Sequence, residues 1–307
     1  MQFFVNPSIP FIKNRQIGFI ISGILILISL VSLVIHGGPA LGIDFTGGTL
    51  IELRFEQSVD VQKIRDVLKE MDLGDSVIQL IGEANQVMIR TPNKQMENEA
   101  RIGEMIEGKL HEAMPGANFE ELRTEFIGPA VGVDLQTDAI LAILTSIIGI
   151  LAYISWRFEF RFAIGAVTAL VHDVVITLGI FSVFNKEITI SIIAAFLTII
   201  GYSLNDTIVV FDRIRENLRL IRNKDYDEVI NLSINHSLSR TIMTSVTTLV
   251  VVLFLFFFGG EVIHDFAFAL IIGVFVGTYS SIFVASPVLV AWHLTSTANA
   301  SKKYRRK

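Results

Sequence analysis

An acidic side chain interrupts one of the apolar stretches of this 307-residue chain. The segment GYSLNDTIVVFDRIREN, residues 201–217, places Asp206 near the end of a run that is otherwise typical of a membrane-spanning helix. A carboxylate in the hydrocarbon layer is costly, so a residue of this kind is a candidate functional residue. Asp206 lies seven residues inward from Arg213, the first basic residue after the run, which is about 10 Å at ~1.5 Å per residue. Asp206 is therefore expected to lie within the hydrocarbon layer, nearer its cytoplasmic side.

Arg240, in the next apolar stretch, is the candidate partner of Asp206. Each residue is 18 positions from the expected outer end of its own span, which puts both about 27 Å from the outer surface at ~1.5 Å per residue. An ion-coupling pair is therefore geometrically feasible. Two simpler interpretations stay open: hydroxyls such as those of Tyr202 and Ser203 could hold Asp206 as structural glue, and Arg240 could be an anchor at the inner surface.

Four other polar residues lie inside apolar stretches and form a candidate secondary site. Tyr202 and Asn205 flank Asp206, and His172 and Asp173 lie about ten residues into the preceding apolar stretch. Buried polar groups of this type either serve function or satisfy one another at helix contacts. No ligand spacing, and hence no metal site, is evident among the remaining histidines, which are His36, His111, His236, His264 and His293.

The elements that must position these residues are membrane helices. Hydrophobic residues make up 51% of the chain, charged residues only 18%, and the mean hydropathy is +0.58, values that indicate an integral membrane protein. Six segments are long enough for a span of about 20 residues. They are 17–35, 138–156, 162–184, 188–210, 241–258 and 263–293.

Lysine and arginine between the segments predict the orientation. Basic residues precede the first span, follow the second and fourth, and fill the C-terminal tail, while the connections on the other side hold only Lys186 outside the large loop. Basic residues concentrate on the cytoplasmic side, so both termini are expected in the cytoplasm. The expected division is a cytoplasmic N-terminus (1–16), helix 1 (17–39), an extracytoplasmic domain (40–130), helices 2–6 (131–293) and a basic tail (294–307).

The extracytoplasmic loop reads as a folded domain. It carries 17 acidic and 9 basic residues, a net charge of −8. Alternating and helical patterns predict the order βαββαβ, which is that of a ferredoxin-like α+β fold. The chain has no cysteine, so this domain needs a core that holds without disulfides. The predicted strands and helices are 49–55, 60–71, 76–81, 86–91, 96–114 and 119–127.

Enzyme chemistry is not indicated. The chain contains no GxSxG, HExxH or GxxxxGK[ST] pattern, so hydrolase or nucleotide-driven chemistry lacks its usual parts. No cofactor is expected. The sequence likewise gives no indication that the chain binds nucleic acid.

Several motifs together resemble the SecF family, accessory subunits of the bacterial Sec protein-export machinery. They are GIDFTGG at 42–48 (Gly42, Asp44, Phe45, Gly47 and Gly48), VHD at 171–173, GYSLNDTIVV at 201–210, DRIREN at 212–217 and SLSRTIMTS at 237–245. The resemblance covers about residues 15 to 293. It implies half of a resistance-nodulation-division type transporter that pairs with SecD, supports SecYEG together with YajC, and uses a proton or sodium gradient to help unfolded polypeptides clear the membrane. It also implies that Asp206 and Arg240 carry the ion coupling.

Three functions stay open at this point. The first is an energy-coupled export subunit that moves H⁺ or Na⁺. The second is a passive scaffold of the translocon, and the third is half of a lipid or drug exporter of the same architecture. Since the chain holds a single transporter half, a subunit that needs a partner is favoured over a complete exporter.

Overall fold

The computed structural model describes residues 7–81, 85–92 and 101–294. These fall into two compact units, one formed by residues up to Ala40 and from Ala142 onward, the other by Leu41–Leu141.

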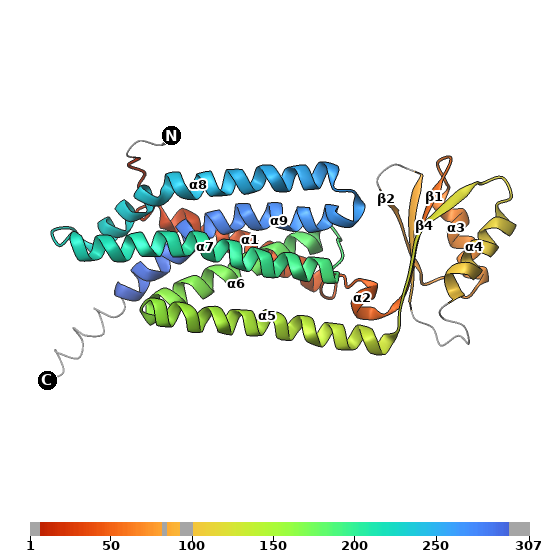
Figure 1. Ribbon diagram of the computed structural model, residues 1–307, viewed down its shortest axis with the longest axis horizontal. Coiled ribbons are helices and arrows are strands. Elements are labelled where there is room, and N and C mark those ends of the chain that lie inside the picture. Colours follow the sequence, from red (N-terminus) through yellow and green to blue (C-terminus); the bar gives the residue numbers. More distant parts are fainter. Residues whose placement is uncertain (1–6, 82–84, 93–100, 295–307) are drawn as a thin grey trace. The chain divides into compact units, whose positions relative to one another are not determined.

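Six helices of the described chain are long and apolar enough to cross a membrane (Figure 1). Their number agrees with the sequence-based expectation, and the chain is a multi-pass membrane protein. The bounds are α1 (Arg15–Ile35), α5 (Pro129–Arg157), α6 (Phe160–Val183), α7 (Ile190–Leu220), α8 (Tyr226–Phe258) and α9 (Glu261–Ser280), the last continuing as helix to Leu294.

Helix α8 is much longer than its apolar part. The expected span began at residue 241, whereas the helix begins at Tyr226 after Asp225, and its first turn holds Asp227 and Glu228. Acidic residues in a first turn are favourable next to the positive end of the helix dipole. Hydropathy marks only the lipid-embedded part, so it missed this polar extension.

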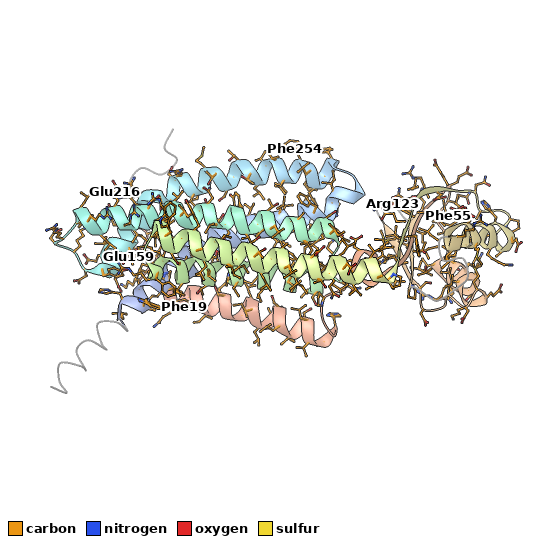
Figure 2. The ribbon with its side chains drawn as sticks, turned by 60° about the horizontal axis from the view of Figure 1, so that its bottom comes forward. Phe19, Phe55, Arg123, Glu159, Glu216 and Phe254 are labelled. Carbon is orange, nitrogen blue, oxygen red and sulfur yellow. The ribbon has the colours of Figure 1, made fainter. Side chains whose placement is uncertain are left out.

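Small residues let the helices of the membrane unit pack closely. Helix α7 contacts α6, α8 and α9, and α1 packs along α6. At Gly179 of α6, an added Cβ would lie 2.0 Å from the side chain of Ser29 on α1, so no larger residue fits without movement. Close approach at glycine and serine is typical of helix pairs in membranes. Large apolar side chains such as Phe19 and Phe254 point outward (Figure 2), being 41% and 62% exposed.

The last span contains a wider turn. Residues 281–285 form a π-helical segment, and Ser286 Oγ donates to the carbonyl of Ser281 at 2.9 Å. Pro287 follows directly. Proline lacks the N–H that would bond to the fourth residue before it and its ring crowds that carbonyl, so the chain widens just ahead of it. Such π-bulges are frequent near functional sites.

The second unit has the ferredoxin-like fold that the sequence predicts. Its four antiparallel strands lie in the order β2-β3-β1-β4, with α3 and α4 inserted between β1 and β2 and between β3 and β4. The helix expected over 96–114 is described as α4 from residue 102, and residues 93–100 lie outside the described chain. The bounds are β1 (Gly48–Phe55), α3 (Val61–Glu70), β2 (Val77–Ile81), β3 (Gln86–Thr91), α4 (Ile102–Ala113) and β4 (Phe119–Ile127).

Alternation of side chains explains the core of this unit. Ile51, Leu53 and Phe55 point to one face of β1, where they pack with Ile64 of α3 and Ile106 of α4. All five are at most 2% exposed. A single well-packed apolar layer between sheet and helices therefore holds the unit together without disulfides.

The GIDFTGG motif forms a short helix and a tight entry into the sheet. Helix α2 (Ile43–Thr46) ends at Gly47, whose φ of +68° is strained for other residues. Gly132, in the first turn of α5, packs against Phe45 and Gly47 so closely that a Cβ would lie 3.0 Å from backbone atoms. Phe45 is buried, and Asp44 lies in the first turn of α2. The motif residues thus build the junction between strand β1 and the start of α5.

Candidate functional site

Asp206 is buried among hydroxyl groups of two other helices. It is 1% exposed on α7. Thr244 Oγ1 donates to Asp206 Oδ1 at 3.3 Å and Ser245 Oγ to Asp206 Oδ2 at 3.4 Å, both from α8. Ser245 in turn contacts Thr278 Oγ1 of α9 at 2.7 Å. The carboxylate therefore has weak hydroxyl partners that are able to rearrange when its charge changes.

Arg240 lies on α8, one helical turn before the Thr244 that contacts this carboxylate. Thr244 Oγ1 also contacts the backbone carbonyl of Arg240 at 3.1 Å, so the arginine precedes the residue that faces Asp206 by one turn, about 5.4 Å. Its side chain is exposed, and the described residues contain no ion pair between Arg240 and Asp206. The charge of the guanidinium attracts the carboxylate from a distance, but in this conformation the two groups form no direct ion pair within the described residues.

The hydroxyls of Tyr202 and Ser203, named above as alternative structural partners of Asp206, do not contact it within the described residues. Ser203 Oγ donates instead to Asp173 Oδ2 at 2.5 Å. The Tyr202 hydroxyl is buried and has no hydrogen-bond partner within the described residues. Asn205 is exposed on α7. Neighbours in sequence on a helix point in different directions, which is why the partners of Asp206 come from α8 rather than from its own helix.

His172 and Asp173 form the centre of a second buried polar cluster. Both lie on α6 and are 5% and 1% exposed. His172 Nδ1 lies 2.8 Å from Asp173 Oδ1, while Asp173 Oδ2 accepts from Ser203 of α7 and from Ser280 of α9, the latter at 2.8 Å. Of the four residues predicted to form a secondary site, His172 and Asp173 lie together in this cluster. Asn205 and Tyr202 are not part of it.

The Nε2 edge of the His172 ring faces α1 and α9. His172 Nε2 lies 3.0 Å from Ser22 Oγ of α1, and Ser22 Oγ lies 3.1 Å from the hydroxyl of Tyr279. Tyr279 donates to the carbonyl of Gly18 at 2.6 Å, and its ring stacks near that of His172 with centroids 6.0 Å apart. Four helices thus meet at one hydrogen-bonded cluster.

Sequence reasoning missed the hydroxyl residues that complete both sites. A periodic signal was present in α1, where the buried residues Gly18, Ser22, Ser29 and Ser32 recur at helical spacing in an otherwise aliphatic segment. Small residues at this spacing indicate a helix-packing face. The partners on α8 and α9 had no comparable signal, because threonine and serine are common in membrane helices for structural reasons.

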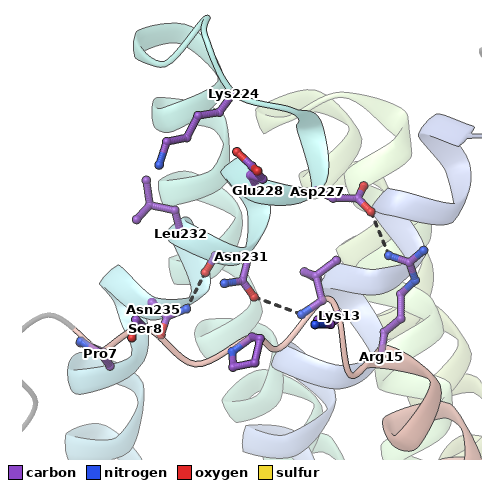
Figure 3. A pocket seen from close by; sticks show the side chains of 12 residues that line it. Pro7, Ser8, Lys13, Arg15, Lys224, Asp227, Glu228, Asn231, Leu232 and Asn235 are labelled. Atoms are coloured by element: carbon purple, nitrogen blue, oxygen red, sulfur yellow. Dashed lines mark hydrogen bonds and ion pairs between the residues drawn. The ribbon is translucent and has the colours of Figure 1, made fainter.

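A pocket of about 580 Å³ lies beside the N-terminal segment at the start of α8 (Figure 3). Asn235 holds this segment through its amide: Oδ1 accepts from Ile9 N and Nδ2 donates to Ile9 O, both at 2.9 Å. Asn231 Oδ1 accepts from Ile12 N at 3.1 Å, and Arg15 pairs with Asp227 at 2.9 Å. The segment ahead of α1 is therefore held against α8 by asparagine side chains, whose amides bond to its backbone N–H and C=O groups as a neighbouring strand would.

No group of three or more His, Asp or Glu side chains in the described residues is arranged to hold a metal ion. The candidate chemistry of the membrane unit is therefore that of single carboxylates, one histidine and hydroxyl groups, which can bind a proton or a small monovalent cation.

Comparison with known proteins gives consistent matches over most of the chain. Residues 106–295 match the family described as protein export membrane protein SecD/SecF, C-terminal, and residues 33–59 match the SecD/SecF GG motif. The chain is 49% identical over 289 residues to the protein translocase subunit SecF of Desulfurispirillum indicum, covering 92% of this chain and 91% of that protein. It is 45% identical to SecF of Haemophilus influenzae, covering 91% and 84%.

Solved structures show the same architecture. The crystal structure of the translocon-associated membrane protein SecDF from Thermus superposes with a TM-score of 0.86 at 38% identity, covering 95% of this chain. A second SecDF structure, in a form titled super-membrane-facing, gives 0.72 at 38% identity and covers 99% of this chain. The chain spans only 40% and 41% of those two SecDF chains.

Proposed function

This chain belongs to the SecD/SecF family of protein-export membrane proteins, and from that premise we propose that it is an ion-driven subunit of the protein-export machinery. Its role lies in protein export. The finer proposal is that a proton or sodium gradient across the bacterial inner membrane, entering through Asp206, drives late steps in the passage of unfolded polypeptide.

The observation that carries this proposal is the environment of Asp206. A carboxylate that is 1% exposed, accepts hydrogen bonds from hydroxyls and has the Arg240 charge only at a distance within the described residues is held weakly when charged, because buried charges usually need a close counter-charge. Uptake of H⁺ or Na⁺ removes this cost. One charge crossing the membrane releases roughly 2.3 kcal/mol per 100 mV, enough to bias a two-state rearrangement that differs by a few kcal/mol.

Arg240 fits this scheme as a counter-charge used in a different conformation. Its backbone is one turn from the hydroxyl that contacts Asp206, so a shift of α8 by one turn relative to α7 would bring the guanidinium level with the carboxylate. An ion-bound Asp206 would favour the present hydroxyl contacts, and an ionised one would favour the arginine.

SecD is the proposed partner half. The match to about two fifths of SecDF supports a chain that supplies one of two membrane halves. SecYEG as the channel, YajC as a further subunit and the unfolded polypeptide as cargo complete the proposed assembly. The polypeptide would meet the ferredoxin-like unit, whose edge strands β2 and β4 each have one unpaired side in the described sheet and are therefore suited to strand addition.

Charges at one end of the membrane unit support the proposed orientation. Glu159 and Glu216 lie at the same end (Figure 2), paired with Arg161 at 2.9 Å and Arg213 at 2.8 Å. Basic residues of short loops favour the cytoplasm. Because the chain lacks cysteine, single Ser58→Cys and Asn223→Cys variants can test this: an impermeant maleimide should label only the first in intact cells.

The central test replaces Asp206 by asparagine, which keeps size and hydrogen bonding but cannot change charge. In vesicles that contain the export channel and SecD, Asp206→Asn should insert at the normal level and lose all gradient-dependent stimulation of export. Asp212→Asn is the matched control, since Asp212 lies on the same helix near Arg157 at the surface. Repeating the assay without sodium separates H⁺ from Na⁺.

The two alternatives predict different outcomes. A passive scaffold would stimulate export equally with Asp206→Asn and without any gradient. Half of a lipid or drug exporter would show gradient-dependent transport of an apolar solute in the absence of the export channel. No structural observation favours either one over ion-driven export.

A further inference from the structure

The cluster around His172 contains a chain of hydrogen bonds. The donor and acceptor of each bond follow from the number of hydrogens that each group carries. The tyrosine hydroxyl carries one hydrogen, and Tyr279 uses it on the carbonyl of Gly18, which can only accept. The 3.1 Å contact between Tyr279 and Ser22 is therefore a hydrogen bond only if Ser22 Oγ–H donates to the phenol oxygen. The single hydroxyl hydrogen of Ser22 then lies in this bond to Tyr279.

The same count fixes one nitrogen of the imidazole. Since Ser22 has no hydrogen left, its 3.0 Å contact with His172 requires that His172 Nε2–H donates to Ser22 Oγ. On the other side of the ring, His172 Nδ1 faces Asp173 Oδ1 at 2.8 Å. An ionised carboxylate can only accept, so this contact also requires a proton between nitrogen and oxygen.

A neutral histidine beside an ionised aspartate cannot satisfy both contacts. With hydrogen on Nε2 only, the lone pair of Nδ1 would oppose the carboxylate of Asp173; with hydrogen on Nδ1 only, the lone pair of Nε2 would oppose that of Ser22. Asp173 Oδ2 offers no relief, because it accepts from the hydroxyls of Ser203 and Ser280. One further proton resolves the conflict, placed either on the ring or on Asp173 Oδ1.

Burial favours the same protonation state. His172 and Asp173 are 5% and 1% exposed, and a net charge is costly at such depth, whereas a hydrogen-bonded pair with zero net charge is tolerated. The titratable groups that face the ring are Asp173 from its own helix and Tyr279 from α9. Helix α1 contributes Ser22 and helix α7 contributes Ser203, with Asp206 one turn further along α7.

We propose that the His172–Asp173 pair is a second proton-binding site of the membrane unit, occupied by one exchangeable proton in this conformation. Its release requires the Ser22–Tyr279 contact between α1 and α9 to break, which frees the Ser22 hydroxyl to donate to the ring. The proposal deepens the ion-driven function and rests on it for its role. Two elements join the sites: Ser203 and Asp206 share α7, and Ser280 and Thr278 share α9.

The protonation state can be measured without any export assay. Full-length protein labelled with ¹⁵N-histidine, in lipid nanodiscs at pH 8, gives the ring protonation by NMR. A histidine with the ordinary pKa of about 6.5 is charged in roughly 3% of molecules at this pH. We expect one histidine, absent from the spectrum of His172→Gln, to carry hydrogen on both nitrogens, or else an infrared carboxylic-acid band that disappears in Asp173→Asn. A singly protonated His172 beside an ionised Asp173 overturns the proposal.

A second variant tests the hydrogen count itself. Tyr279→Phe removes the oxygen that holds the Ser22 hydrogen, so a neutral ring becomes fully bonded and the protonated fraction at pH 8 should fall at least tenfold. Tyr153→Phe on the exposed part of α5 is the matched control and should leave the signal unchanged. An unchanged signal in Tyr279→Phe overturns the proposal. If export proved independent of any gradient while His172 remained protonated, the proposed function would fail and the site would stand.

Discussion

Ser203 and Asp206 lie three residues apart on α7 and bond to different helices. Ser203 donates to Asp173 of α6, whereas Asp206 accepts from Thr244 and Ser245 of α8. Helix α7 therefore carries one buried carboxylate and holds the other. Any movement of α7 along its axis changes both sites together, which makes this helix the central element of the proposed coupling.

Replacing Arg240 should be as damaging as replacing Asp206. If the arginine neutralises the carboxylate in another conformation, Arg240→Met strands a buried charge and abolishes gradient-dependent export. The double variant Asp206→Asn/Arg240→Met should regain thermal stability without activity, because loss of one partner of a buried pair costs more than loss of both. Export in vesicles and thermal unfolding measure the two effects. Arg219→Met, on the exposed end of α7, is the control; normal export by Arg240→Met would leave Arg240 as a membrane anchor.

Gly179→Ala should separate α1 from α6. An added Cβ would lie 2.5 Å from Ser29 Cα, so the helices must move apart, at a cost of about 1–3 kcal/mol. Thermal unfolding in detergent measures the loss. Gly149→Ala on α5, where a Cβ meets nothing within 4 Å, should be neutral or stabilising by about 0.5–1 kcal/mol. Equal stability of the two variants would contradict the close packing.

Asn235→Ala should release the N-terminal segment from α8. The side chain is 3% exposed and makes two bonds to Ile9, so its loss should cost about 1–3 kcal/mol. In a Ser8→Cys background, maleimide labelling should become faster. Asn223→Ala in the exposed α7–α8 turn supplies the comparison, and an unaltered labelling rate in Asn235→Ala would show that Asn231 and Arg15 suffice to hold the segment.

The ferredoxin-like unit should lose stability as pH rises towards neutrality. Burial, followed by the neighbouring carboxyls of Glu121 and Glu104, raises the pKa of Glu107 to about 7. The folded state then holds a proton that the unfolded state releases near pH 4.5, so this stabilisation is complete below pH 4.5 and is lost as pH passes 7. Glu107→Gln should remove this pH dependence. At pH 8 the variant should gain about 1 kcal/mol in the free energy of unfolding, a value reduced for solvent screening.

Hydrogen exchange of the α4 and β4 amides in the whole protein at pH 5 and pH 8 checks this. Glu107→Gln should slow exchange at pH 8 and change little at pH 5. Glu112→Gln lies on the same helix and loses only an exposed pair with Lys109, so it should not alter the pH dependence. A larger effect of Glu107→Gln at pH 5 than at pH 8 would reverse the sign and refute the assignment.

The local pattern of apolar and polar residues was sufficient to predict the architecture. Runs of apolar residues specify membrane helices because lipid demands them, and alternation specifies the strands of the ferredoxin-like unit because each side chain has one face to occupy. Asp206 and the His172–Asp173 pair were also visible, since a polar residue in an apolar run stands out. The polar first turns of α8 were not, because hydropathy carries no information on a helix outside the membrane.

Only the tertiary structure decided which groups meet. Thr244, Ser245, Ser22 and Tyr279 lie far in sequence from the residues they contact, and hydroxyls are too common in membrane helices to mark a site. Equal depth suggested that Arg240 faces Asp206, but the rotation and axial position of α8 against α7 put Thr244 there instead. Those two quantities depend on how close-packed side chains interlock across a helix interface, and a single chain's periodicity does not contain them.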